Sequence, residues 1–388
     1  MALNELIATA NSLRASDLHL EAGTPLVVRV KGELLTVGET IPGPRLIEIG
    51  KELLGHDAWN QFVARGSADV SIRIAGAQCR INLFRTVRGI AMAVRLLTSS
   101  VDSLRACNLH PDLRKLVDAR TGLIVVSGPT GSGKSTTLAA LIGEINSSGA
   151  RHIITVESPL EYLFTNRRSF IRQREIPTHS PSFEQAIMDA LRENPDVLVI
   201  TEMRTPEVMR LTLNAAETGQ LVLATMHSST CAEALSRISM AFSPEIQGSI
   251  LAQLADCLVG VVCQRLDFLA DYQLRVPRCE VLMASSAAKG TIRAGQFSQL
   301  ATVIQSGAEH GMWSFDRYQR WMAQKKDWER PSLVTAAPEE RAAAVAPAVL
   351  APIAKAKTPP KDASFEISID EEEVDLAELA KKIDAKTR

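Results

Sequence analysis

The stretch GLIVVSGPTGSGKSTTLAALI, residues 122–142, decides how the central part of the chain folds. Its first residues form an apolar run of the kind that fills a buried strand. Behind the glycine-rich segment, apolar residues recur at the spacing of one helix face, at Leu138, Leu141, Ile142 and Ile145. The stretch therefore predicts a strand, a tight loop and a helix in that order.

The loop of this unit fits the pattern G-x-x-x-x-G-K-[ST] at every fixed position. Glycines let the backbone wrap phosphates with its N–H groups, and the helix N-terminus adds positive potential. We expect Lys134 to neutralise charge on the outer phosphates of ATP and Ser135 to hold Mg²⁺. The residues predicted to bind the nucleotide are Gly128, Pro129, Thr130, Gly131, Ser132, Gly133, Lys134, Ser135 and Thr136.

Three later apolar runs each end in a side chain suited to catalysis: Glu157, Glu202 and His227. Because parallel strands end at one edge of a sheet, we expect these groups to lie together. Glu202 is the candidate for binding Mg²⁺ directly or through water, Glu157 for activating the attacking water, and His227 for sensing the γ-phosphate. A solvent-facing glutamate and a structural histidine are the alternatives for these positions.

The alternation of apolar β-rich runs with amphipathic stretches is typical of an α/β fold with a parallel sheet. Residues 1–100 predict a small α+β domain and residues 101–275 the P-loop core. We expect a helical C-terminal region at 276–328. Residues 329–388 are rich in alanine and proline and then acidic, which predicts a linker with an amphipathic, disordered tail.

Composition narrows the classes of function. The chain has 388 residues, 46% of them hydrophobic, and a formal net charge of -1, so nucleic acid is not an expected partner. No run reaches the roughly 18 apolar residues that a membrane span needs, which favours a cytoplasmic location. The cysteines show no C-x-x-C pairing, so neither zinc nor disulfides are expected at Cys79, Cys107, Cys231, Cys257, Cys263 and Cys279.

Taken together, four ordered segments resemble the motifs of the secretion ATPase superfamily, which drives type II secretion, type IV pili and some type IV secretion systems. GPTGSGKSTTLAALI is similar to its Walker A motif and RENPDVLVITEMR to its Walker B motif. ITVESPLEY is similar to the Asp box and AAETGQLVLATMHSSTCAEALSRI to the His box. The likeness extends from about residue 10 to residue 325.

This resemblance implies a PAS-like N-terminal domain and a RecA-like ATPase domain, with Arg80 and Arg95 reaching the nucleotide. It also implies a homohexameric ring, peripherally associated with the inner membrane at the pilus base, that acts on a pilus platform protein. The short N-terminus and the missing tetracysteine pattern favour the branch that powers type IV pilus retraction. The tail offers a docking segment for another pilus ATPase or regulator.

The chain departs from the family pattern at several places. The Asp box carries Ser158 where the family has aspartate, and Thr201 and Thr205 flank the Walker B glutamate. In the C-terminal element AAKGTIRA, Arg293 is retained and Lys289 stands in place of arginine. These departures leave two alternatives open: an ATPase of a type IV secretion or other filament system, and a weakly hydrolysing regulatory paralogue at the pilus base.

Overall fold

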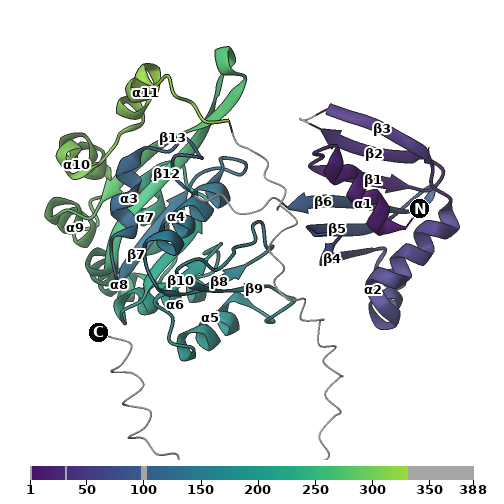
Figure 1. Ribbon diagram of the computed structural model, residues 1–388. Helices are drawn as coiled ribbons and strands as arrows, with labels where there is room; N and C mark the ends of the chain where they lie inside the picture. Colours follow the sequence, from purple (N-terminus) through teal and green to yellow (C-terminus); the bar gives the residue numbers. More distant parts are fainter. Residues whose placement is uncertain (1, 31–32, 98–102, 331–388) are drawn as a thin grey trace, which may run out of the picture. The chain divides into compact units, whose positions relative to one another are not determined.

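The computed structural model describes residues 2–30, 33–97 and 103–330 (Figure 1). The predicted tail falls outside these residues from position 331 onward. The described residues form two sheets, and each sheet has its own hydrophobic core. The chain is therefore a mixed α/β protein, as predicted. No helix in the described part of the chain combines the length and apolar character needed to cross a membrane.

The N-terminal sheet is antiparallel throughout, with strand order β3-β2-β1-β6-β5-β4. Its elements are α1 (Leu3–Ser12), β1 (Asp17–Glu21), β2 (Pro25–Val30), β3 (Glu33–Thr40), α2 (Gly43–Arg65), β4 (Ser67–Ile74), β5 (Ala77–Thr86) and β6 (Gly89–Leu97). Short β-like runs at 26–30, 70–74, 80–84 and 91–96 and a helical pattern near 46–62 predict β2, β4, β5, β6 and α2. Elements α1, β1 and β3 were not predicted. The residues of β3 are mostly exposed, so no hydrophobic alternation marks that strand.

Alternation along these strands separates two faces of the sheet. Leu18, Ile81 and Val94 are buried and belong to the core that α1 and α2 complete. Since side chains alternate along a strand, the predicted nucleotide contacts Arg80 and Arg95 belong to the opposite face.

The second sheet has strand order β13-β12-β7-β11-β10-β8-β9 and is parallel except for β13. Its strands are β7 (Gly122–Ser127), β8 (His152–Glu157), β9 (Phe170–Glu175), β10 (Val197–Ile200), β11 (Leu221–Met226), β12 (Leu258–Leu269) and β13 (Leu274–Met283). The helices are α3 (Arg114–Val117), α4 (Lys134–Ser148), α5 (Phe183–Arg192), α6 (Pro206–Glu217), α7 (Cys231–Met240), α8 (Pro244–Cys257), α9 (Ser286–Arg293), α10 (Leu300–Ser306) and α11 (Phe315–Gln324).

The order of the strands decides where the helices lie. The connections from β7 to β8 and from β8 to β9 run across the sheet in one direction. The connections from β9 to β10, from β10 to β11 and from β11 to β12 run in the other. Because such connections are right-handed, α4 covers one face, and α5, α6 and α8 cover the other. Every residue of β7, β10 and β11 is buried, as expected for strands covered on both faces.

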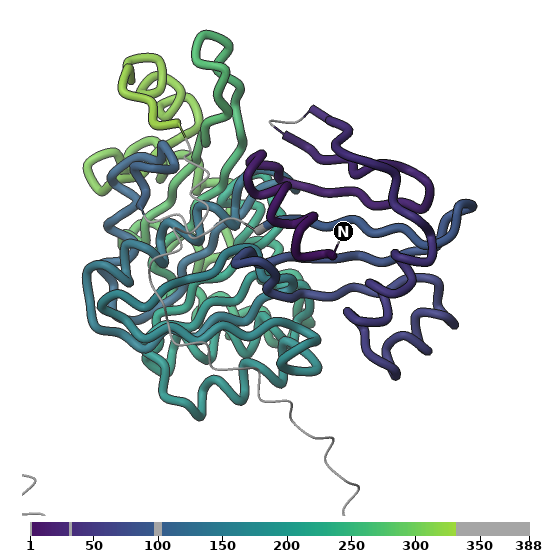
Figure 2. Tube along the Cα trace, turned by 45° about the vertical axis from the view of Figure 1, so that its right-hand side comes forward, coloured from purple at the N-terminus to yellow at the C-terminus, as the bar shows by residue number. Residues whose placement is uncertain are grey.

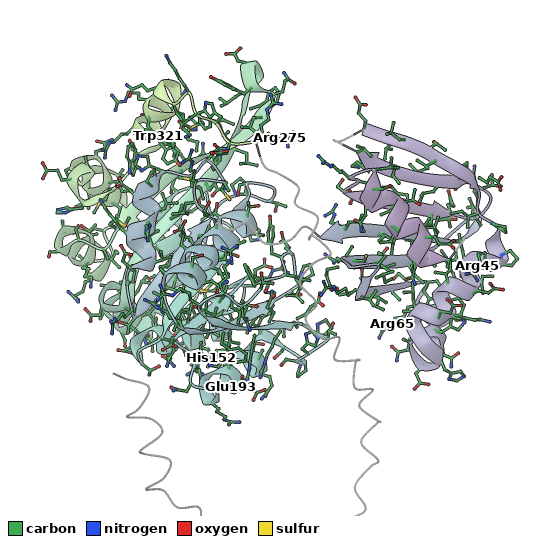
Figure 3. All side chains as sticks on the ribbon, viewed as in Figure 1. Arg45, Arg65, His152, Glu193, Arg275 and Trp321 are labelled. Atoms are coloured by element: carbon green, nitrogen blue, oxygen red, sulfur yellow. The ribbon has the colours of Figure 1, made fainter. Side chains whose placement is uncertain are left out.

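Strand β13 crosses the predicted boundary at residue 275 and extends the sheet to Met283. It pairs with β12 as a long antiparallel hairpin, which Figure 2 shows in green, projecting beyond the other strands. Arg275, labelled in Figure 3, lies on this hairpin next to its turn. The remaining limits of the predicted domains stay predictions.

Candidate functional site

The phosphate loop joins the buried end of β7 to the start of α4, as the sequence predicts. Two of its glycines are required by close packing. A Cβ atom on Gly128 would lie 2.4 Å from the carbonyl oxygen of Gln264, and one on Gly133 would lie 2.8 Å from Gln264 Nε2. Both glycines also have positive φ, at 149° and 85°. Any larger residue would therefore push the loop away from β12.

Gln264 of β12 holds the phosphate loop and the start of α4 through two hydrogen bonds. Its Nε2 donates to the carbonyl of Ser132 at 2.6 Å, and its Oε1 accepts from Thr137 Oγ1 at 2.5 Å. The side chain is 2% exposed, so water cannot replace these bonds. Sequence reasoning missed Gln264, because a glutamine in an apolar strand carries no motif that points to a loop 132 residues away.

Lys134 lies at the centre of the site. Its ammonium donates to the carbonyls of Gly128 at 2.9 Å and Pro129 at 3.0 Å. Burial lowers the pKa of Lys134, while the charges of Glu202 and Glu161 oppose that shift. The lysine is thus a cation held among acceptors of its own loop, and an anion in the loop would be a stronger partner.

Glu202 and His227 meet as expected from the parallel strands that precede them. β10 and β11 are neighbours, and each residue follows its strand closely. His227 Nε2 lies 3.0 Å from Glu202 Oε1, and His227 Nδ1 lies 3.5 Å from Lys134 Nζ. Glu202 also forms an ion pair with Arg204. These contacts link Lys134, His227 and Glu202 into one polar chain.

Glu161 contacts the phosphate loop and was missed by sequence reasoning. Ser135 Oγ, the predicted Mg²⁺ ligand, donates to Glu161 Oε1 at 2.8 Å. Thr136 Oγ1 lies 2.7 Å from the hydroxyl of Tyr162, so the segment after β8 lies against the start of α4. The signal was present as a second carboxylate, four residues after Glu157 in ITVESPLEY.

Glu157 lies behind this contact. It is 5% exposed, and its Oε1 accepts from Thr155 Oγ1 at 2.6 Å and from Gln173 Nε2 at 3.0 Å. Burial raises the pKa of Glu157 to about 7, against the lowering effect of these hydrogen bonds. Glu157, Glu161 and Ser135 line the same small cavity. The structure thus brings two carboxylates beside the loop, one buried and one exposed.

Two of the departures from the family pattern have structural explanations. Ser158 Oγ donates to the carbonyl of Ile176 at 3.2 Å, a bond that an ionised aspartate could not donate. Thr205 is the N-cap of α6, and its Oγ1 accepts from the backbone of Val208 at 3.2 Å. Aspartate and threonine both serve as N-caps, so this substitution preserves the start of the helix.

Arg80 and Arg95 are opposite each other on β5 and β6 of the N-terminal sheet. Arg95 Nε lies 2.9 Å from Asp17 Oδ1, and the arginine side chain is 67% exposed. This ion pair is local to the sheet. Contact of either arginine with a nucleotide stays a prediction.

Residues 2–302 match the family model described as "Type II/IV secretion system protein". The chain is 32% identical over 318 residues to the type IV pilus retraction ATPase PilT of Pseudomonas aeruginosa, covering 81% of this chain and 92% of that protein. It is 39% identical to a twitching motility protein of Neisseria gonorrhoeae, covering 79% and 84%. It is 38% identical to the uncharacterized protein YggR of Escherichia coli, covering 82% and 97%.

Solved structures show the same likeness. The crystal structure of the pilus retraction motor PilT with bound ADP aligns with a TM-score of 0.74 at 31% identity, covering 84% of this chain and 98% of that one. The ATPase DotB of Legionella pneumophila aligns with a TM-score of 0.68 at 25% identity, covering 84% and 96%.

Proposed function

Because the chain belongs to the family of type II/IV secretion system proteins, we propose that it is an ATP-hydrolysing motor that powers type IV pilus retraction and so twitching motility. The polar chain from Lys134 through His227 to Glu202 carries the proposal for hydrolysis. It supplies a cation for the outer phosphates and a carboxylate for a metal ion. The likeness to PilT and to a twitching motility protein supports retraction.

We propose ATP with Mg²⁺ as the ligand of this site. The loop N–H groups suit phosphates, and the hydroxyl of Ser135 and the carboxylate of Glu202 are the hard oxygen donors that Mg²⁺ prefers. Within the loop, the hydroxyl of Ser132 is buried and has no hydrogen-bond partner among the described residues. When bound, the metal ion supplies positive charge at the outer phosphates.

Two carboxylates are candidates for orienting the attacking water. The sequence predicts Glu157, whereas the hydrogen bond to Ser135 favours Glu161. Glu157 has a pKa of about 7, so near neutral pH it can hold or release a proton inside the same cavity. We assign the contact with the water to Glu161. Glu157 remains the buried carboxyl that can hold or release a proton in the same cavity.

The proposal includes a homohexameric ring in which Arg80 and Arg95 contribute to nucleotide binding. The ring is proposed to act in the cytoplasm at the pilus base, on the platform protein of the inner membrane. These parts rest on the family resemblance and not on contacts within the chain.

The decisive experiment measures steady-state phosphate release by the full chain with Mg-ATP, beside Glu202→Gln, together with oligomeric mass. We expect a hexamer whose turnover is lost in the variant. Retraction is then tested by expressing the chain in a retraction-deficient strain, with Lys134→Ala as the inactive control. A turnover-competent hexamer that restores no twitching would refute retraction but not ATP hydrolysis.

A second candidate is a weakly hydrolysing regulatory paralogue. It is favoured by Ser158, whose hydroxyl is directed to Ile176 at the position where the family carries a carboxylate. A hexamer that binds ATP but releases no phosphate would support this candidate and contradict the motor.

A further inference from the structure

Three metal-ligand side chains converge behind the phosphate loop: Cys231, Cys263 and Glu280. They come from the first turn of α7, from β12 and from β13, which lie side by side in Figure 1. One ligand atom from each lies within 4.8 Å of the other two. Both thiols are buried, and the carboxylate is partly buried. Over residues 2–30, 33–97 and 103–330, no other group of three His, Cys, Asp or Glu side chains converges in this way.

The tertiary fold creates this group. Cys263 and Glu280 are paired across the β12–β13 hairpin. Cys231 begins α7, directly after the loop that carries His227. The backbone N–H of Cys231 donates to Glu280 Oε1 at 2.7 Å, which aligns α7 with the hairpin. The absence of C-x-x-C spacing predicts no zinc at these cysteines, and spacing along the chain does not reveal this group, because its members are adjacent only in three dimensions.

The spacing suits a soft divalent cation. A tetrahedral zinc ion with Zn–S bonds of about 2.3 Å holds its sulfur ligands about 3.8 Å apart, which falls within the 4.8 Å that bounds the three ligand atoms here. The thiol of Cys231 donates to the carbonyl oxygens of Val261 and Glu280 at 3.5 and 3.6 Å, so its sulfur lies against both strands of the hairpin. Two sulfurs and one carboxylate form a donor set that Zn²⁺ accepts.

A simpler explanation applies to each residue separately. Buried cysteines often act as small apolar side chains, and a carboxylate at a helix N-terminus is stabilising by itself. Those reasons account for Cys231, Cys263 or Glu280 one at a time. They do not require two thiols to lie around one carboxylate. Among the described residues, Cys79, Cys107 and Cys257 belong to no such group.

We propose that Cys231, Cys263 and Glu280 bind one Zn²⁺ ion. Binding replaces the two thiol protons, which are released to solvent, by two metal–sulfur bonds, and no oxidation takes place. The ion would tie α7 to the hairpin beneath the nucleotide site. Cys263 is next to Gln264, which holds the loop, and Cys263 pairs with Ser127 at the end of β7.

The test is a titration of the full chain with Co²⁺ alone, in the presence of a phosphine reductant that keeps the thiols reduced. We expect one equivalent to produce a sulfur-to-metal absorption band, which Zn²⁺ then removes by displacement. The band should be lost in Cys231→Ala and Cys263→Ala and weakened in Glu280→Gln. It should persist in the matched controls Cys257→Ala and Cys279→Ala, which alter buried cysteines outside the group.

Unfolding temperature provides the second measurement. A ligand that binds only the folded state stabilises it, so Zn²⁺ should raise the unfolding temperature of the wild type and of Cys257→Ala but not of Cys231→Ala. The proposal fails if the folded wild type gives no band. It also fails if the band survives in Cys231→Ala and Cys263→Ala. Neither result depends on ATP hydrolysis, so the proposed motor is tested separately.

Discussion

At the scale of single residues, environment separates the roles of two glutamates that are four positions apart. Glu157 ends β8 inside the protein, where Thr155 and Gln173 bind one of its oxygens. Glu161 is exposed and accepts from Ser135 of the phosphate loop. The same functional group is therefore easily protonated at one position and ready to contact a ligand at the other.

The kinetic prediction compares these two glutamates. We expect Glu161→Gln to lower kcat by about 100-fold or more, because it removes the carboxylate next to Ser135. Glu157→Gln should also lower kcat, but less, since its amide can still accept from Thr155 and Gln173. Steady-state phosphate release measures both, and nucleotide affinity serves as the control for folding. A larger loss of kcat in Glu157→Gln than in Glu161→Gln would show that Glu157, and not Glu161, orients the attacking water.

The raised pKa of Glu157 also predicts a pH dependence of stability. In the unfolded chain this carboxyl loses its proton near pH 4.5, but in the folded protein it does so near pH 7. Between these values the folded state binds more protons, so the free energy of unfolding falls as pH rises. The full effect is about 3 kcal/mol.

Glu157→Gln should abolish this contribution, because glutamine does not titrate. Urea unfolding at several pH values should therefore show that the free energy of unfolding of the variant rises relative to that of the wild type from about pH 5 to pH 8. The exposed Glu309→Gln is the matched control. A stability difference between Glu157→Gln and wild type that stays constant with pH would contradict the raised pKa.

At the scale of elements, β12 acts as the support of the phosphate loop. The loop approaches β12 so closely that Gly128 and Gly133 cannot carry side chains, and Gln264 fills the space with two hydrogen bonds. The order of the strands makes this possible, since β12 is the neighbour of β7.

Gln264→Leu tests this support. The substitution leaves the carbonyl of Ser132 and the hydroxyl of Thr137 without their partner, at a cost of about 1–3 kcal/mol in the free energy of unfolding. We also expect weaker nucleotide binding, measured by titration with a fluorescent ATP analogue. The control is Gln299→Leu at an exposed position. Unchanged affinity in Gln264→Leu would show that the loop holds its shape without β12.

At the scale of the whole molecule, the last described residues fold back onto an early segment. The side-chain amide of Asn108 donates to the backbone carbonyl of Glu329 at 2.7 Å and accepts from its N–H at 2.8 Å. Nearby, Trp321 of α11, labelled in Figure 3, packs with His110, Trp313 and Tyr318. Contacts across 221 positions thus anchor the C-terminal helix to the start of the P-loop core.

Asn108→Gly should lower the free energy of unfolding by about 1–2 kcal/mol through loss of the two hydrogen bonds. Asn108 has a φ of 58°, a conformation that asparagine and glycine tolerate. Asn108→Ala should therefore cost about 1 kcal/mol more than the glycine variant. Chemical unfolding followed by tryptophan fluorescence measures both. If the glycine variant equals the wild type, the anchor contributes no stability.

The local sequence was sufficient for much of the fold and for part of the site. The phosphate loop, the strands before Glu202 and His227, and most strands of both sheets were predicted, because each depends on residues close together in the chain. Strands β1, β3, β9 and β12 and the extent of β13 were not predicted. Most residues of β3 are exposed and β9 is largely polar, so neither strand carries a buried apolar run.

The sequence by itself determined the family, the phosphate loop and the strand ends that carry Glu157, Glu202 and His227, because periodicity and motif spacing are local properties. Only the tertiary structure decided that Glu161 contacts Ser135, that Gln264 supports the loop, and that Cys231, Cys263 and Glu280 converge. The physical reason is that strand order and chain reversals set those distances, and no spacing along the chain encodes them.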